Sequence, residues 1–150
     1  MAVMLDPVGL FRSTSPEARR TLSERGRLRT FEAGDVLMRQ GEAADSMYVI
    51  LSGRVRVDRD APGQSVPALL AELGANEVVG EIGVLDGGAR TATVTAIEET
   101  RTLELHRTLL AVVLLQYPDI AGELLRTLSR RLRSTDEILD TLARGNKDQT

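Results

Sequence analysis

The chain has 150 residues, 42% of them hydrophobic, and a formal net charge of -3. This length suits one domain with a hydrophobic core, and the slightly acidic balance argues against a surface that grips nucleic acid over its whole extent. The absence of cysteine excludes disulfides and zinc–sulfur sites, and a single histidine excludes a multi-histidine metal site.

Membrane and export signals are not expected. The first residues lack the basic segment of a signal peptide, and Asp6 and Pro7 interrupt their apolar character. The longest apolar run, at 109–115, is far shorter than a bilayer span. We therefore expect a cytoplasmic protein.

The N-terminal two thirds of the chain read as one helix followed by short strands. The tripeptide Ser-Pro-Glu at 15–17 supplies an N-cap, a proline at the first helical position and an acidic first turn. Residues 27–106 then show stretches of period two separated by glycine turns. Strands are expected over the apolar run at 47–51, at 66–73 and over the alternating threonines of 91–96. Many short strands of this kind predict a mainly β fold, an antiparallel β-roll (jelly-roll) of about eight strands.

After residue 106 the period of the apolar residues becomes 3.6, which predicts helices. A short helix is expected at about 107–115, and a long one from Pro118 to about Ala143 with Gly145 as its C-terminal stop. Within the long helix, alternating spacings of three and four define a heptad seam with one polar member. Its members are Leu125, Leu128, Leu132, Thr135, Leu139 and Leu142.

Two interpretations of this heptad seam remain open: packing on the chain's own domain, or a parallel helix–helix homodimer. We favour the dimer, because the seam is longer than one small roll can cover. Four arginines on the same helix, at 126, 130, 131 and 133, are interpreted as a solvated face rather than a DNA-binding surface, since acidic residues follow closely.

The segment 78–94 contains the candidate site. Gly80 leaves room for a ligand to approach the backbone, and residues 81–85 can form one helical turn whose free amides face an anion. Arg90 follows a glycine-rich loop and can contact a phosphate with two hydrogen bonds, to which Thr91 adds a hydroxyl donor. Because phosphate repels a carboxylate, Glu81 suits a sugar hydroxyl instead. These groups indicate a nucleoside monophosphate site, although a glycine-rich hairpin with an incidental Glu–Arg surface pair would fit the residues alone.

This segment resembles the phosphate-binding cassette of cyclic-nucleotide-binding domains, whose pattern is Gly-Glu-apolar, a short loop, then Arg-Ser/Thr/Ala-Ala. The similarity extends over about 27–143. The motifs Gln-Tyr-Pro-Asp-Ile at 116–120 and Arg-Arg-Leu at 130–132 resemble the helical part of the catabolite activator proteins. The resemblance implies a single domain over 1–150, with the β-roll at about 27–106 and C-terminal helices at about 107–143.

The resemblance also implies a role for each site residue. Glu81 would accept the ribose 2′-hydroxyl, and Arg90, Thr91 and backbone amides would hold the cyclic phosphate. Thr135 would reach the adenine amino group from the long helix. The implied binding residues are Leu70, Val79, Gly80, Glu81, Ile82, Gly83, Arg90, Thr91, Ala92 and Thr135.

Some positions depart from the family pattern. Ala89 stands where many members have proline, and Val79 replaces a frequent aromatic residue. Catabolite activators continue into a helix-turn-helix domain, whereas only a few polar residues follow the long helix, so this chain alone is not expected to bind DNA.

We therefore expect a non-catalytic sensor of cAMP, or of cGMP, that signals to a downstream protein through its C-terminal helix. The alternatives are a shortened or truncated transcription regulator and a ligand-independent interaction module; a cyclic dinucleotide ligand also stays open. No catalytic residue, metal or cofactor is expected. His106 has no histidine or cysteine near it and is interpreted as structural.

Overall fold

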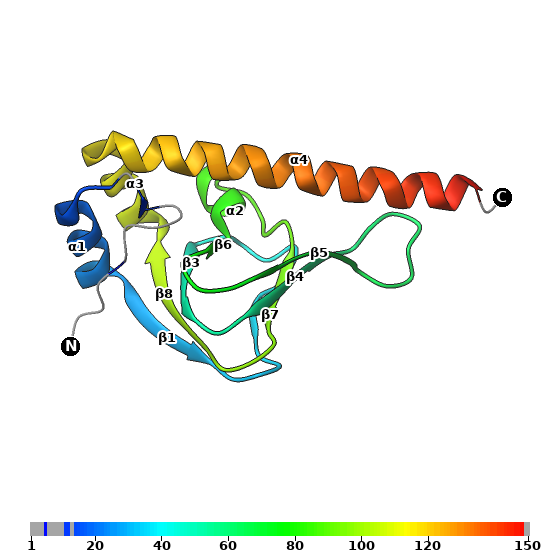
Figure 1. Ribbon diagram of the computed structural model, residues 1–150, viewed down its shortest axis with the longest axis horizontal. Coiled ribbons are helices and arrows are strands. Elements are labelled where there is room, and N and C mark those ends of the chain that lie inside the picture. Colours follow the sequence, from blue (N-terminus) through cyan, green and yellow to red (C-terminus); the bar gives the residue numbers. More distant parts are fainter. Residues whose placement is uncertain (1–4, 6–10, 13, 149–150) are drawn as a thin grey trace.

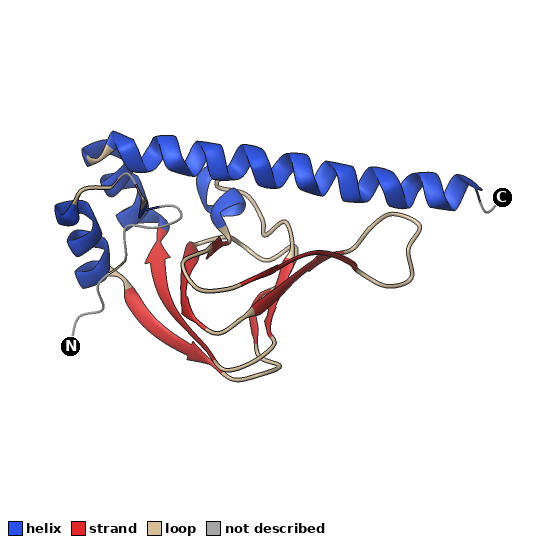
Figure 2. Ribbon diagram, in the orientation of Figure 1, coloured by secondary structure: helices blue, strands red, loops and turns tan. Residues whose placement is uncertain are grey.

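The computed structural model describes residues 5, 11–12 and 14–148, without the side chains of 86, 132, 134–139 and 141–148. Its eight strands form two antiparallel four-stranded sheets that close into a roll, with helices at the N-terminal and C-terminal sides (Figures 1 and 2). The predicted fold class is confirmed.

The two sheets are made from strands distant in sequence. The first has the order β1 (Arg27–Phe31), β8 (Thr100–His106), β3 (Ser46–Ser52), β6 (Val78–Val79). The second has the order β2 (Val36–Met38), β7 (Thr93–Ala96), β4 (Val55–Arg59), β5 (Ala68–Leu73).

Strand β3 is buried on both of its faces, which explains why its sequence is a continuous apolar run. Met47 and Val49 belong to a core between the first sheet and the helices. Tyr48 and Ile50 point the other way, into a second core inside the roll. The first sheet is therefore the middle layer of the molecule, with helices on one face and the second sheet on the other.

Two of the helices begin at a residue whose side chain caps them. Helix α1 (Pro16–Arg25) starts as predicted: the Ser15 hydroxyl accepts a hydrogen bond from the Ala18 amide at 3.1 Å. Helix α3 (Arg107–Gln116) is capped by His106, whose Nδ1 accepts a hydrogen bond from the Thr108 amide at 3.2 Å. His106 thus has the structural role expected of it.

Helix α4 (Pro118–Asp148) runs along the whole molecule above the roll (Figure 1). Ile120 and Leu124 are buried against the first sheet and the other helices, and Leu128 packs partly against the same core. Leu125 remains 64% exposed. The first two members of the predicted heptad seam therefore face different ways: Leu128 faces its own domain, whereas Leu125 faces solvent. The side chains of Leu132, Thr135, Leu139 and Leu142 lie outside the described residues.

Three predicted boundaries were wrong. Helix α4 continues through Gly145 to Asp148, because glycine lowers helix stability but keeps the N–H that proline lacks. Strand β5 begins at Ala68 rather than at 66, because Pro67 cannot donate to the ladder. Strand β7 begins at Thr93, the first residue of this segment to pair with β4.

Among the described residues, no single helix has both the length and the apolar composition needed to cross a membrane. Helix α3 and the first half of α4 meet these criteria only together, as a pair bent by 117°.

Candidate functional site

Helix α2 (Glu81–Asp86) lies between two glycines in the left-handed conformation. Gly80 has φ 86° and Gly87 has φ 73°, so both ends of this short helix need a residue without a β-carbon penalty. The one-turn helix predicted at 81–85 is confirmed, and it brings the Glu81 side chain toward α4.

Gly80 is also required by its neighbours. A β-carbon at this position would lie 2.6 Å from Arg90 Nη1 and 2.8 Å from Met38 Cε. From the sequence, the space at Gly80 is expected to admit a ligand. In the structure, the Arg90 guanidinium and the Met38 methyl group occupy the space beside it.

The Arg90 side chain is a buried, fixed cation. The residue is 7% exposed, and its Nη1 donates to the Ser46 carbonyl at 2.6 Å and to the Gly80 carbonyl at 3.3 Å. Its backbone is fixed as well: its N–H donates to the Glu42 carbonyl, and its carbonyl accepts from the Gly41 amide. Burial lowers the pKa of Arg90, with acidic neighbours opposing this effect.

A polar network inside the roll supports the carbonyl that holds Arg90. The Ser46 hydroxyl donates to Glu104 Oε2 at 3.0 Å, and Arg29 forms an ion pair with the same carboxylate at 3.4 Å. Burial raises the pKa of Glu104, but hydrogen bonds from Tyr48 and Ser46 and the charge of Arg29 outweigh it, so this pKa lies below its usual value. Burial, reinforced by Glu104, raises the pKa of Tyr48.

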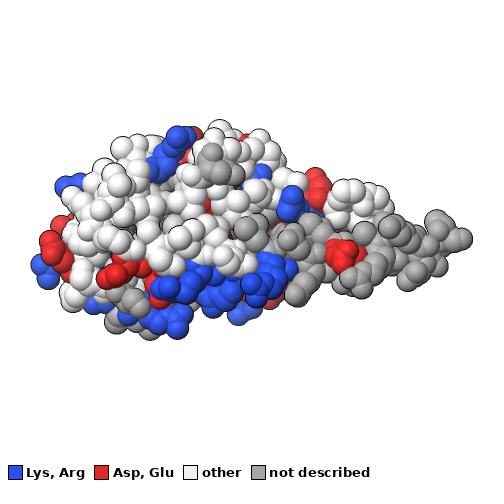
Figure 3. Space-filling model, turned by 90° about the horizontal axis from the view of Figure 1, so that it is seen from above, with Lys and Arg blue, Asp and Glu red and all other residues white. Residues whose placement is uncertain are grey.

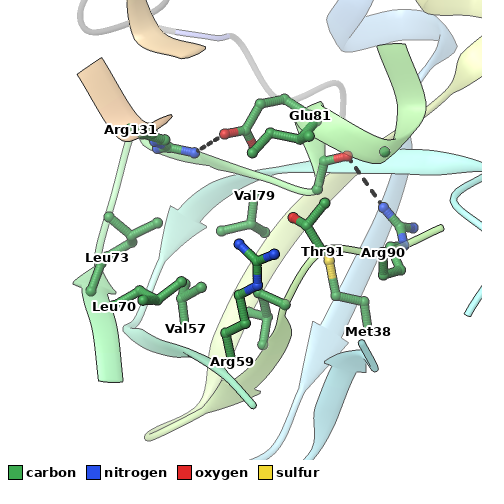
Figure 4. A pocket seen from close by; sticks show the side chains of 16 residues that line it. Met38, Val57, Arg59, Leu70, Leu73, Val79, Glu81, Arg90, Thr91 and Arg131 are labelled. Atoms are coloured by element: carbon green, nitrogen blue, oxygen red, sulfur yellow. Dashed lines mark hydrogen bonds and ion pairs between the residues drawn. The ribbon is translucent and has the colours of Figure 1, made fainter. Parts of the chain in front are cut away.

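Glu81 is paired with a residue from the long helix. Arg131 Nη1 lies 2.6 Å from Glu81 Oε1 and also donates to the Val78 carbonyl, and the Glu81 side chain is only 4% exposed (Figure 4). The interpretation of Arg131 as part of a solvated arginine face was therefore wrong. Arg126, Arg130 and Arg133 are exposed as expected, and Figure 3, which looks down on α4, shows basic side chains gathered on this face.

Glu81, Arg90 and Arg131 line one cavity of about 300 Å³. Nine of the ten candidate residues line it, while the side chain of Thr135 lies outside the described residues. The wall on β4 and β5 is mostly apolar and includes Val57, Leu70 and Leu73. Sequence reasoning missed seven lining residues: Met38, Val57, Arg59, Ala71, Leu73, Val94 and Arg131.

Two of these missed residues had a detectable signal in the sequence. Val57 and Arg59 share the strand parity of buried Val55, so both face inward. Arg131 gave no such signal, because it lies in a run of arginines and only the packing of α4 distinguishes it from its neighbours. Among the described residues, no group of three or more His, Asp or Glu side chains is placed to hold a metal ion.

Comparison with known proteins agrees with this geometry. The family model of the cyclic nucleotide-binding domain matches residues 28–117, a range that includes the whole cassette. The chain belongs to this family. As a cyclic nucleotide-binding domain, it contains Gly80, Glu81, Arg90 and Thr91 in the family's order, all lining the cavity.

Its relatives include transcription regulators and a kinase regulatory subunit. A CRP-like cAMP-activated global transcriptional regulator of Mycobacterium tuberculosis is 34% identical over 95% of this chain and 63% of that protein. The catabolite activator protein of Thermus thermophilus is 33% identical with a TM-score of 0.80, over 91% of this chain and 63% of that one. The regulatory subunit of a cAMP-independent protein kinase A from Trypanosoma brucei is 25% identical with a TM-score of 0.71, over 85% and 44%. The chain thus spans less than two thirds of the length of each of these relatives.

Proposed function

We propose that this chain is a non-catalytic regulatory domain that binds a cyclic mononucleotide, with cAMP as the first candidate and cGMP as the second. The observation that carries the proposal is the convergence of Glu81, Arg90 and Thr91 on one cavity. Arg90 and Thr91, with the amides of Ile82 and Ala92, would hold the cyclic phosphate. Glu81 would accept the ribose 2′-hydroxyl. The choice of cAMP rests on the relatives named as cAMP-activated.

The size of the cavity favours a mononucleotide over a cyclic dinucleotide. Small-molecule sites range over roughly 300–1,000 Å³, and this cavity, at about 300 Å³, lies at the lower end. A single base, sugar and phosphate suit that volume, whereas a second nucleotide would need additional space.

Signalling would pass through the contact between Glu81 and Arg131, because it joins the ribose-binding acid to α4. A ribose hydroxyl that donates to Glu81 changes the surroundings of this ion pair, and α4 can respond by changing its position or its partner, a shift between two populations. Exposed Leu125 supports a homodimer through α4, and an unidentified downstream protein would read the change. A cytoplasmic location would follow from kinship with transcription regulators.

Two other functions are kept. The chain would be a shortened or truncated transcription regulator if its reading frame continued into a DNA-binding domain, which its 63% coverage of the Mycobacterium regulator supports. It would be a ligand-independent module if it resembled the cAMP-independent kinase subunit in function as well as in fold. The Glu81–Arg131 ion pair favours this second alternative, because it gives the Glu81 carboxylate a partner without a ligand.

Titration calorimetry of the wild type with cAMP, cGMP and a cyclic dinucleotide separates a nucleotide-binding domain from a ligand-independent module and ranks the candidate ligands. We expect cAMP to bind, and the Arg90→Leu variant to bind it about ten- to a hundredfold more weakly, the value of a charged hydrogen bond of roughly 1.5–3 kcal/mol. Because Arg90 also holds two buried carbonyls, circular dichroism must show that the variant is folded, and Arg90→Lys provides a second variant that keeps the charge. Unchanged cAMP affinity in a folded Arg90→Leu protein would remove Arg90 from the site.

A further inference from the structure

Strand β4 carries Arg56 and Arg59, and Arg54 directly precedes it; the three arginines differ in their partners. Arg54 pairs with Glu72 at 3.1 Å and Arg56 pairs with Asp58 at 3.2 Å, both on the outer, exposed side. Arg59 is only partly exposed and forms no hydrogen bond or ion pair with any side chain that the structure describes. The three arginines therefore do not share one solubilising role.

Arg59 points into the cavity. It has the same strand parity as Val55 and Val57, and it lines the cavity with Val57 and Leu70. The pairing of β4 with β5 shifts between Val57 and Asp58, which leaves Leu70 without a partner and bulges this wall. In the close view, the Arg59 guanidinium lies below Val79, between Val57 and Thr91, apart from the Glu81–Arg131 pair (Figure 4).

The other two cavity arginines are already engaged. Arg90 donates to two backbone carbonyls, and Arg131 donates to Glu81 and to a carbonyl. The guanidinium donors of Arg59 are all available, because no acceptor among the residues that the structure describes bonds to them. A partly buried cation beside apolar walls gains most from an acceptor that a ligand brings.

The remaining step rests on the proposed function. If Arg90 and Thr91 bind the phosphate and Glu81 binds the ribose, the base has to lie along the apolar wall formed by Val57 and Leu70. Among the described lining residues, Arg59 is the polar side chain available to the base at this wall. We infer that Arg59 donates a hydrogen bond to N7 of a purine base. N7 is an acceptor in both adenine and guanine, and pyrimidines have no such atom. Arg59 therefore selects purine over pyrimidine cyclic nucleotides.

The test removes one atom of the ligand, N7, and one side chain of the protein, Arg59, separately and together. Wild type, Arg59→Met and the strand-matched control Arg56→Met are titrated with cAMP, 7-deaza-cAMP and cyclic CMP. Wild type and Arg56→Met should bind cAMP about ten- to a hundredfold more tightly than 7-deaza-cAMP, the range for a hydrogen bond to a charged group. Arg59→Met should lose that preference, bind cAMP more weakly by the same factor, and narrow the gap between cAMP and cyclic CMP.

Three results would overturn this inference. An equal loss for all three ligands in Arg59→Met would make Arg59 a second phosphate contact. A wild type that binds cAMP and 7-deaza-cAMP equally, with both weakened in Arg59→Met, would mean that the guanidinium stacks on the face of the base. Failure of the wild type to bind any cyclic nucleotide would refute the proposed function itself and the role of Arg59 with it. The comparison of the two cAMP forms on wild type needs no variant, so it stands even if Arg59→Met does not fold.

Discussion

The contact between Arg131 and Glu81 gives a sharp stability prediction. Replacing Arg131 by methionine keeps the aliphatic stem but removes the cation that lies 2.6 Å from Glu81 Oε1. The Glu81 carboxylate, on a side chain that is 4% exposed, then stays buried without this partner, and the Val78 carbonyl loses a donor. Removing one partner of a fully buried ion pair costs about 3–5 kcal/mol. Because Arg131 is itself 26% exposed, water can replace part of the contact, and we expect about 1–3 kcal/mol.

Urea unfolding of Arg131→Met, read by circular dichroism, measures this loss directly. The neighbouring Arg130 is exposed, so Arg130→Met controls for the change of residue type and should stay within about 0.5 kcal/mol of wild type. The double variant Glu81→Gln/Arg131→Met removes the charge along with its partner and should recover part of the loss. If Arg131→Met were as stable as Arg130→Met, the ion pair would not hold α4 to the cassette, and the signalling route proposed through it would fail.

Two further predictions concern the support of the cassette. Gly80→Ala should destabilise the fold more than Gly34→Ala. Both positions have a positive φ, which costs about 1–2 kcal/mol for a residue with a β-carbon, but only a β-carbon at Gly80 would meet Arg90 and Met38 within 3 Å. Equal losses of stability in thermal unfolding would argue against that contact. Glu104, whose pKa lies below its usual value in the folded protein, contributes stability that is present above pH 4.5 and is lost as the pH falls through the folded pKa. Glu104→Gln should therefore flatten the acid side of the stability profile, and an unchanged acid side would exclude Glu104 as its cause.

The parts of the fold that follow local rules could be predicted from the sequence. The Ser-Pro-Glu start of α1, the one-turn helix between glycines and the proline that begins α4 each depend on residues close together in the chain. The end of α4 could not be predicted in the same way, because a glycine near a helix end permits a stop without requiring one.

The site residues likewise fall into those that local sequence predicts and those that only the packing reveals. Glu81, Arg90 and Thr91 lie in one continuous segment whose residue types indicate their chemistry. Arg131 reaches Glu81 from 50 positions further along the chain, and nothing in its local sequence separates it from Arg130. Arg59 was within reach of sequence reasoning, because a charged residue at an inward-facing strand position is unusual enough to indicate a function.

The cap on α3 gives the molecule an internal spectroscopic reporter. His106 is the only histidine in the chain, and because its Nδ1 accepts the Thr108 amide, the ring proton of the neutral imidazole must lie on Nε2. One pair of imidazole nitrogen resonances therefore identifies the tautomer without any assignment problem. Since α3 contacts both β8 and α4, a change in that tautomer on adding a nucleotide would record movement at the junction between the roll and the long helix.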